Sequence, residues 1–363
     1  MFQPRPSPHA KKYNNTPIIQ QSTLENLNLP KEIAETIAKS INHSLASKTK
    51  GTYKTAMNML LKCRETFPNN FNIPLGEREI LLFIGWNINR GLKASSIKSY
   101  LSGIKALHRA WGWGEIVTDT PFISSVLKGE TNINIEEQSL NPSPHKRLPV
   151  TIQILKLIKQ EIRLGNLDPF DKIMYWGVCS LLFYGALRSA EILCDSEMTF
   201  DPISDLLKCD MNIVRIANRD GFDEVLQIKI RRGKCNKSGT PEIVDIYPTG
   251  NDTCPLRAFK KVQEITANNS NALPLFRTKN GKNLSKSNLN KLLSDITSPY
   301  IKNGVISAHS FRAGLISMFA GEGLSEEDLR AVGRWSSRAF EFYIKLDRTN
   351  RAQIARLIAE YDT

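Results

Sequence analysis

A short run near the end of the 363-residue chain gathers the residue types that phosphate chemistry needs. His309 and Arg312 stand three residues apart, so a helix would place both side chains on one face. Arginine offers a planar fork of donors that matches phosphate oxygens, and a tyrosine hydroxyl can attack phosphorus as a nucleophile. Trp335 adds a ring N–H donor, and Tyr343 follows one expected helix later. The run therefore predicts a phosphate site, although each residue alone also has a purely structural interpretation.

A second arginine and a carboxylate lie far upstream. An apolar run from Ile173 to Tyr184 breaks at Gly185 and is followed by Arg188 and Glu191, three residues apart. The run is apolar on all sides, which predicts a buried helix. An arginine held at the end of a buried helix is preorganised, as a phosphate clamp requires.

Taken in order, these residues resemble the catalytic set of the tyrosine recombinase (phage integrase) family. That family carries an Arg in a Gly-hydrophobic-Arg-x-x-Glu context, a hairpin Lys, a His-x-x-Arg, a His or Trp, and a Tyr. The resemblance covers residues from about 30 to 350. Within it, Gly333-Arg334-Trp335-Ser336-Ser337 ahead of Tyr343-Ile344 resembles recombinases of Crypton- and DIRS-type mobile elements.

The resemblance assigns roles to these residues. Tyr343 would attack a scissile DNA phosphate to give a 3′-phosphotyrosyl link and a free 5′-hydroxyl. Tyr343 lies eight residues after Trp335, whereas many phage and bacterial members have nine, and Tyr361 is the one later tyrosine. The remaining roles are charge stabilisation by Arg188 and Arg312, hydrogen bonds from His309 and Trp335, and orientation of Arg188 by Glu191.

The general acid of the family is a lysine on a β-hairpin. Three runs with period-two patterning between residues 211 and 248 predict antiparallel strands, and residues 231–239 form a basic turn between the last two. Lys234 matches the family position best, and Lys237 is the rival. No metal and no ATP is required, because the phosphotyrosine link keeps the bond energy and the sequence has neither a P-loop nor a metal-ligand cluster.

Helical patterning dominates the rest of the chain. Apolar stripes predict helices that begin near residues 30, 47 to 49, 77 and 94, with a short one at about 121–128. Further helices are expected from Thr151, from Asp168-Pro169, at about 254–266 and 285–295, through the His-x-x-Arg run, and at 326–332. The expected fold is mainly α with a small antiparallel β-sheet. The resemblance implies a SAM-like helical core-binding domain and a mixed α+β tyrosine-recombinase catalytic domain.

Five segments follow from these patterns. Residues 1–28 are expected to be a flexible arm, 29–130 the helical core-binding domain, and 131–147 an aperiodic linker. Residues 148–348 are expected to be the catalytic domain, and 349–363 a final amphipathic helix. That helix would either pack on its own domain or dock on a neighbouring protomer in a tetramer on DNA.

Basic and hydroxyl side chains are the candidates for contact with duplex DNA. Most lie at helix starts or opposite the apolar stripes, and Ser95 and Ser96 begin a helix whose N–H groups favour phosphate. A solvated charged face is the structural alternative. The candidates are Lys48, Lys50, Lys54, Lys93, Ser95, Ser96, Lys98, Lys105, Arg109, Arg231 and Arg232.

Composition is consistent with a DNA partner. The 49 basic and 36 acidic residues give a formal charge of +13, which favours a polyanion. The six cysteines form no CxxC pair, no signal-peptide pattern opens the chain, and no apolar run approaches membrane-spanning length. These features predict a protein of the nucleus or cytoplasm with no membrane association.

The sequence therefore predicts a site-specific DNA recombinase or integrase that acts on defined sites and mobilises a transposon or viral element. Two alternatives stay open. A type IB topoisomerase shares the same constellation and relaxes DNA without a defined site. A DNA-binding protein that keeps the fold without catalysis is the second alternative.

Overall fold

The computed structural model describes residues 30–43, 47–110, 113–116, 118–140, 147–218, 221–231, 241–335 and 341. The chain divides into two compact units, Met1–Pro142 and Ser143–Thr363. Each unit has its own hydrophobic core.

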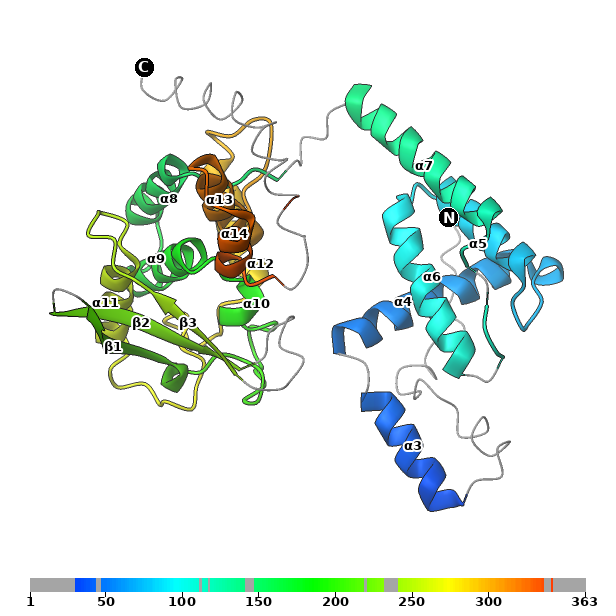
Figure 1. Ribbon diagram of the computed structural model, residues 1–363, viewed down its shortest axis with the longest axis horizontal. Helices are drawn as coiled ribbons and strands as arrows, with labels where there is room; N and C mark the ends of the chain where they lie inside the picture. Colours follow the sequence, from blue (N-terminus) through cyan, green and yellow to red (C-terminus); the bar gives the residue numbers. More distant parts are fainter. Residues whose placement is uncertain are drawn as a thin grey trace. The chain divides into compact units, whose positions relative to one another are not determined.

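The first unit is helical in its described part. Its helices are α3 (Lys31–His43), α4 (Ser47–Thr66), α5 (Glu77–Asn89), α6 (Ala94–Ala110) and α7 (Pro121–Leu140), with a short 3-10 turn, η2, at Pro68–Asn70. Figure 1 shows α4, α5, α6 and α7 as one bundle. The core forms where the expected apolar stripes meet, around side chains such as Leu60, Phe83 and Ile104. The helices predicted from residues 47, 77 and 94 are confirmed.

Helix α7 differs from its prediction. The sequence suggested a short helix to residue 128 and an aperiodic linker from 131, but the helix continues to Leu140. Ile123 and Leu127 anchor its first turns in the core, whereas Ile133 and Ile135 are half or more exposed. Helix α7 thus continues beyond its packed first turns. Apolar periodicity did not indicate this extension because periodicity marks only the packed part of a helix.

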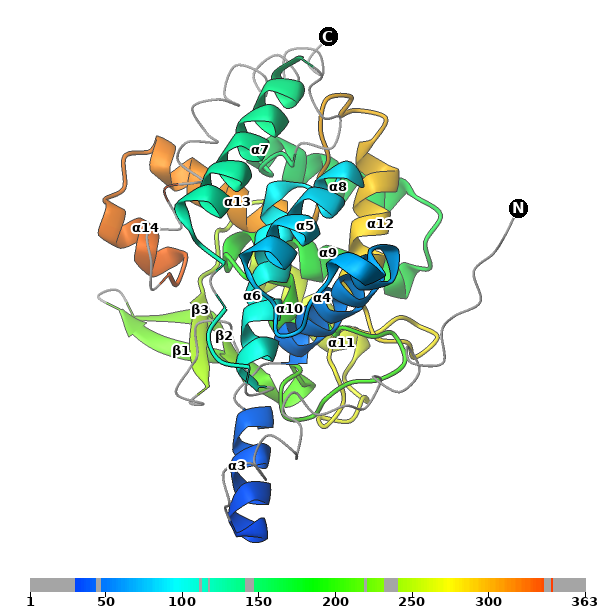
Figure 2. The ribbon, with the colours of Figure 1, turned by 90° about the vertical axis from the view of Figure 1, so that its right-hand side faces the viewer.

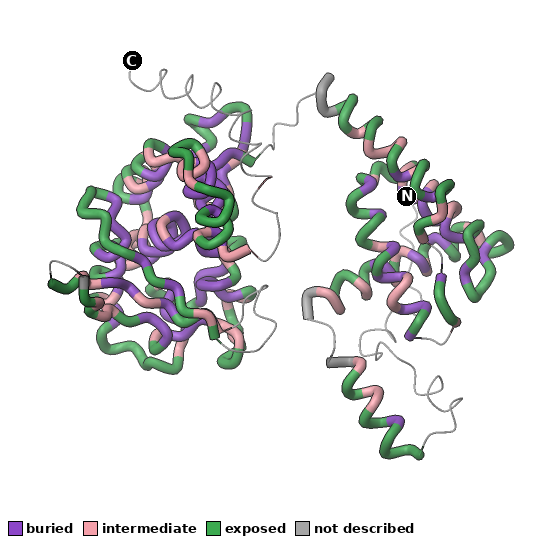
Figure 3. Tube along the Cα trace, in the orientation of Figure 1, coloured by how far each residue is buried: buried purple, intermediate pink, exposed green. Residues whose placement is uncertain are grey.

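The second unit is built around a buried helix. Its helices are α8 (Ile152–Leu164), α9 (Pro169–Tyr184), α10 (Ser189–Ile192), α11 (Pro255–Ile265), α12 (Lys286–Thr297), α13 (Ala308–Gly321) and α14 (Glu326–Val332). Figure 1 shows α9 surrounded by α8, α11 and α13, and Figure 3 shows it as largely buried. Asp168 caps α9 by accepting from Phe170 N at 2.9 Å, with Pro169 in the first turn. The predicted apolar helix is therefore the centre of the core.

A three-stranded antiparallel sheet completes this unit, after a short 3-10 turn, η3 (Lys208–Asp210). Its strands are β1 (Met211–Asn218), β2 (Gly221–Ile230) and β3 (Glu242–Ile246), in the order β1-β2-β3 that Figure 2 shows. Leu226 pairs with Ile246, and Ile230 with Glu242. The prediction of a small antiparallel sheet in a mainly helical protein is confirmed. Across the described residues, no helix has the length and apolar character needed to span a membrane.

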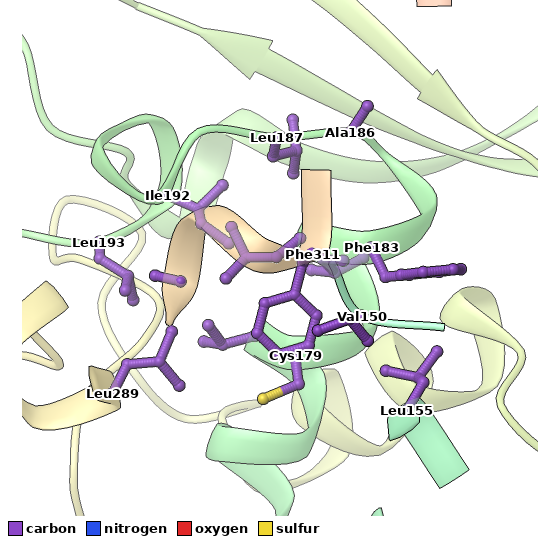
Figure 4. Packing of buried hydrophobic residues seen from close by; sticks show 14 of the residues in the cluster. Val150, Leu155, Cys179, Phe183, Ala186, Leu187, Ile192, Leu193, Leu289 and Phe311 are labelled. Atoms are coloured by element: carbon purple, nitrogen blue, oxygen red, sulfur yellow. The ribbon is translucent and has the colours of Figure 1, made fainter. Parts of the chain in front are cut away.

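The helix that carries His309 and Arg312 is positioned by an unusually close contact. Leu148 N donates to Val305 O at 3.1 Å, and Val150 N donates to Ser310 O at 2.9 Å, so the segment entering the unit lies along α13. A Cβ on Gly314 would overlap the carbonyl oxygen of Val150, so only glycine allows this approach. Phe311 fills the core beneath, near Val150 and Cys179 (Figure 4). The expected linker therefore ends before Arg147, which already pairs with Val305 in a parallel bridge.

Candidate active site

Arg312 lies at the centre of the candidate site and is almost completely buried. Arg312 is 1% exposed, and one of its guanidinium nitrogens donates to Ala186 O at 2.6 Å. A second nitrogen donates to Gly333 O. His309, one helical turn earlier, is exposed. The prediction that a helix carries both residues is confirmed. Their exposure differs because the Arg312 side chain contacts Ala186 and Gly333, in the loops that precede Arg188 and Trp335.

Trp335 covers the Arg312 guanidinium. The centre of the guanidinium lies 4.7 Å from the centroid of the indole ring, which is a cation–π arrangement. A Cβ on Gly333 would overlap the Trp335 ring, so glycine is required for the ring to lie in this position. The contact of Trp335 with Arg312 thus depends on a glycine at position 333.

Arg188 and Glu191 form the ion pair that their spacing suggested. Arg188 caps helix α10, and its guanidinium donates to Glu191 Oε1 at 2.9 Å while its backbone N–H donates to Oε2 at 2.8 Å. The Arg188 side chain is 19% exposed and that of Glu191 only 3%. This geometry is suited to the orienting role proposed for Glu191, because a buried carboxylate fixes an arginine that still reaches the surface.

The buried carboxylate has a second partner that the sequence did not indicate. Arg334 donates to Glu191 Oε2 at 2.6 Å and to Glu242 Oε2 at 3.2 Å. Burial alone would raise the pKa of Glu191, but the charge and hydrogen bond of Arg334, followed by the backbone and side-chain hydrogen bonds of Arg188, bring it below its ordinary value. Glu191 is therefore a carboxylate at neutral pH.

Strained backbone accompanies these contacts. Among the described residues, the two non-glycine positions with positive φ are Ala186 at 44° and Arg334 at 49°. The carbonyl of Ala186 accepts from Arg312, and Arg334 binds Glu191. Such conformations persist where the surrounding contacts over-determine them, which is common at functional sites.

Positive charge gathers around His309. The pKa of His309 lies below its ordinary value, first because surrounding protein partly removes the ring from water and second because cationic side chains lie near it. These side chains belong to Arg312, Arg147, Lys286 and Arg188. Arg147 lies in the expected linker and Lys286 at the start of α12, and only the tertiary fold brings either one beside the His-x-x-Arg helix.

Several predicted residues lie outside the described part of the chain. They include the proposed nucleophile Tyr343, the lysine candidates Lys234 and Lys237, and Arg232. The 1–28 arm and the 349–363 helix are outside it too, as is the Lys48 side chain. Their assignments stay predictions from sequence.

The basic candidates of the first unit are mostly on its surface. Lys54, Lys93 and Lys98 are exposed, as are Ser95 and Ser96 in the first turn of α6, while Lys50 and Lys105 are half-buried. Arg109 is exposed but its guanidinium is paired with Glu115 at 2.8 Å. The expected N-terminal position of Ser95 and Ser96 is therefore found, and Arg109 would have to leave a carboxylate to bind DNA.

Arg231, a predicted DNA contact, also has a structural role. Its Nε donates to Asp210 at 2.5 Å, and a terminal nitrogen donates to Pro202 O at 2.8 Å. Asp210 is itself buried and accepts from Leu207 N. Arg231 thus ties the end of β2 to η3 and, like Arg109, would have to leave a carboxylate to bind DNA.

Arg334 and Glu242 are the site residues that sequence reasoning missed. Arg334 lies between the two motif residues Gly333 and Trp335, which is the one signal that could have drawn attention to it. Arg334 and Glu242 also line an open pocket of about 560 Å³. Its other lining residues are Glu327, Arg330, Ala331 and Trp335.

Neither the known protein-family models nor the curated proteins include a match to this chain. Its fold, however, is shared with solved tyrosine recombinases and integrases. XerH site-specific recombinase bound to palindromic difH substrate, in a post-cleavage complex, superposes with a TM-score of 0.56 at 14% identity, covering 95% of this chain and 91% of that one.

Two integrases give similar results. The Tn1549 transposon integrase in complex with transposon right end DNA has a TM-score of 0.52 and 16% identity, over 88% of this chain and 98% of its own. A lambda integrase dimer bound to a COC′ core site has a TM-score of 0.50 and 14% identity, over 93% and 81%. At such identities the likeness shows a common fold, and it confirms the expected fold class.

Proposed function

We propose that this protein is a tyrosine-type DNA strand transferase, a site-specific recombinase that cleaves and rejoins DNA. The observation that carries the proposal is the assembly of Arg188, Glu191, His309, Arg312 and Trp335 at one place from three separate segments. The fold supports it, since the similar solved structures are recombinases and integrases.

The chemistry follows from these groups. The phenolic oxygen of Tyr343 loses its proton to water and forms a bond to phosphorus, while the bond from phosphorus to the 5′-oxygen breaks and a hairpin lysine protonates that oxygen. Arg188 and Arg312 offset the charge that grows on the non-bridging oxygens. With a lowered pKa, His309 is neutral at neutral pH and can donate a hydrogen bond to the phosphate.

The burial of Arg312 suits this role. A guanidinium held by two carbonyls and an indole ring needs no reorganisation when charge develops nearby, which is the condition for large electrostatic stabilisation. Arg188 is partly exposed, and its charge, like that of Arg312, acts on His309.

Finer assignments belong to the same proposal. The motif around Trp335 favours an element of Crypton or DIRS type, mobilised within the nucleus or cytoplasm. The partner is duplex DNA with defined sites, and four protomers would assemble on two such sites. The C-terminal helix, 349–363, would link neighbouring protomers.

Covalent trapping tests the proposal. Nicked suicide duplexes tiled across the DNA that flanks the coding sequence are incubated with the protein, and SDS-resistant adducts are mapped by mass spectrometry. We expect a 3′-phosphotyrosyl adduct on Tyr343 with one duplex, and none with Tyr343→Phe, which should bind that duplex with nearly unchanged affinity.

Other outcomes contradict parts of the proposal. An adduct that persists in Tyr343→Phe would move the nucleophile, with Tyr361 as the first candidate. Relaxation of a supercoiled plasmid without site preference would favour a topoisomerase. Tight binding without any adduct would favour a DNA-binding protein that lacks catalysis.

A further inference from the structure

Two arginines from distant segments share the buried carboxylate of Glu191. Arg188 donates to its Oε1 at 2.9 Å, and Arg334 donates to its Oε2 at 2.6 Å. The Glu191 side chain is 3% exposed, and those of Arg188 and Arg334 are 19% and 11% exposed. Two positive charges thus bind one negative charge at a place where water screens charges weakly.

A carboxylate paired with Arg188 alone would oppose the proposed work of that arginine. Because screening is weak, the negative charge of Glu191 would repel a phosphate that Arg188 binds. The contact that orients Arg188 would then cancel part of its attraction for the phosphate. A second cation on the same carboxylate removes this conflict, since it offsets the charge of Glu191 and leaves the orienting hydrogen bonds in place.

Arg334 is held where it can supply that second charge. Its backbone has a φ of 49°, a conformation that disfavours an arginine, so its contacts must hold it there. The other terminal nitrogen donates to Glu242 at 3.2 Å, but the Glu242 side chain is 32% exposed. Water therefore screens the charge of Glu242 more than that of Glu191, and the stronger pairing of Arg334 is with Glu191.

We propose that Arg334 is a positioning residue that offsets the charge of Glu191, so that Glu191 orients Arg188 without weakening its attraction for the phosphate. The inference rests on the proposed strand-transfer function. It makes the carboxylate acceptable beside the phosphate clamp only in the company of the second arginine. Loss of Arg334 should therefore slow the reaction, and loss of Glu191 in addition should restore part of the rate.

Comparison of Arg334→Gln with the double variant Arg334→Gln/Glu191→Gln is the sharpest test. The substrate is the suicide duplex that the wild type cleaves. Arg334→Gln should lower single-turnover cleavage about tenfold or more, because an uncompensated charge is left in a weakly screened site. The double variant should cleave at least about threefold faster than Arg334→Gln, since the opposing charge is gone. A double variant as slow as the single one, or slower, would overturn the inference.

A neutral phosphate gives a second measure. A methylphosphonate at the scissile position carries no negative charge, so Glu191 has no charge there to repel. On that duplex, Arg334→Gln should cleave within about threefold of the wild-type rate on the same duplex. An equal loss on both duplexes would show that Arg334 has only a structural role and would overturn the inference.

Two substitutions serve as controls. Lys260 pairs with Glu224 at 2.6 Å, both side chains are more than 40% exposed, and neither belongs to the candidate site. Lys260→Gln removes a cation from a carboxylate in the same unit and should cleave both duplexes at the wild-type rate. Arg334→Lys keeps the positive charge and should cleave within about threefold of the wild type. A loss of tenfold or more in Arg334→Lys, with the protein folded in thermal unfolding, would contradict the role of charge.

Titration of the Glu191 carboxyl carbon by NMR separates the inference from the proposed function. Arg334 holds the pKa of Glu191 below its ordinary value, so that pKa should rise in Arg334→Gln and stay unchanged in Lys260→Gln. An unchanged pKa in Arg334→Gln would overturn the inference whether or not a duplex is cleaved. Failure of the wild type to cleave any duplex, together with the expected rise in pKa, would count against the proposed function alone.

Discussion

Arg312 combines a structural role with its proposed role at the phosphate. Its buried guanidinium binds the carbonyls of Ala186 and Gly333 and stacks under Trp335. Arg188, by contrast, keeps a partly exposed side chain that is paired with Glu191. The two clamp arginines should therefore respond differently to removal, although both serve the same chemistry.

Comparing Arg312→Ala with Arg188→Ala checks this difference. Arg312→Ala should lower the free energy of unfolding by about 3 kcal/mol, because it leaves buried carbonyls without donors. Arg188→Ala should cost about 1 kcal/mol. Both should lower cleavage at least about 10²-fold, the effect of losing one preorganised donor. Urea unfolding and single-turnover assays measure the two quantities, and equal stability of the two variants would contradict the structural role of Arg312.

His309 reports the positive field of the site. Its pKa is lowered by partial removal from water and by nearby cations that include Arg147 and Lys286. Arg147→Ala and Lys286→Ala should each raise the pKa of His309, because each removes a charge that opposes protonation. Titration of the imidazole resonances by NMR measures the shift. An unchanged pKa in both variants would show that these residues do not act on the site.

Glu191 makes the second unit sensitive to acid. Its pKa is below the ordinary value in the folded protein, so its ionised form contributes stability that is present above the unfolded pKa and lost as pH falls through the folded one. Glu191→Gln should be less stable than the wild type at neutral pH. The difference should shrink as pH falls below about 4.3, the ordinary value for Glu. Chemical unfolding at stepped pH tests this, and a constant difference would contradict it.

At the scale of elements, the contact between α13 and the segment before α8 decides where the site forms. Gly314 allows Val150 to lie directly against the helix, and Val150 N donates to Ser310 O at 2.9 Å. At the start of the helix, Ala308 N donates to Asn290 Oδ1 at 2.8 Å, which ties α13 to α12. These contacts fix the register in which His309 and Arg312 are presented.

Gly314→Ala should therefore disturb the site from a distance. A Cβ would clash with the Val150 carbonyl, so we expect a loss of about 3 kcal/mol in unfolding free energy, at the upper end for overpacking, together with slower cleavage. Gly85→Ala is the matched control, since Gly85 lies within α5 and a Cβ there meets nothing within 4 Å. That change should stabilise its helix slightly. A harmless Gly314→Ala would show that the close packing is not required.

At the scale of the whole molecule, two units with separate cores carry a formal charge of +13. The basic surface of the first unit and the cationic surroundings of His309 in the second suit one polyanionic partner. Under the proposed function, each unit would bind phosphates of one duplex. That function also includes a further step, the assembly of several chains on DNA.

Deletion of residues 350–363 tests that step. The apolar residues of this segment, Ile354, Leu357 and Ile358, recur at helical spacing and would dock on a neighbouring protomer in a cyclic array. The truncated protein should fold and bind a single site but form no higher-order complex in native gels or light scattering. Loss of folding would indicate instead that the helix packs on its own domain, and unaltered assembly would also contradict docking.

The sequence by itself determined the elements and the order of the chemical groups. Helix starts at Thr151 and Asp168, the buried run to Tyr184 and the period-two strands were predictable, because caps and apolar periodicity are local properties. The extension of α7 to Leu140 was missed, since its last turns have few packed apolar positions to indicate a helix.

Only the tertiary structure decided which of the charged residues share a site. Nothing local distinguishes Arg231, which is held by Asp210, from an arginine exposed to DNA. Nothing local pairs Arg334 with Glu242, which lies 92 residues away, or brings Arg147 and Lys286 beside His309. Ion pairs depend on distance in space and on burial, and packing of the core around α9 sets both. Sequence spacing specifies which side chains share one face of a helix, whereas the fold specifies which other residues those side chains contact.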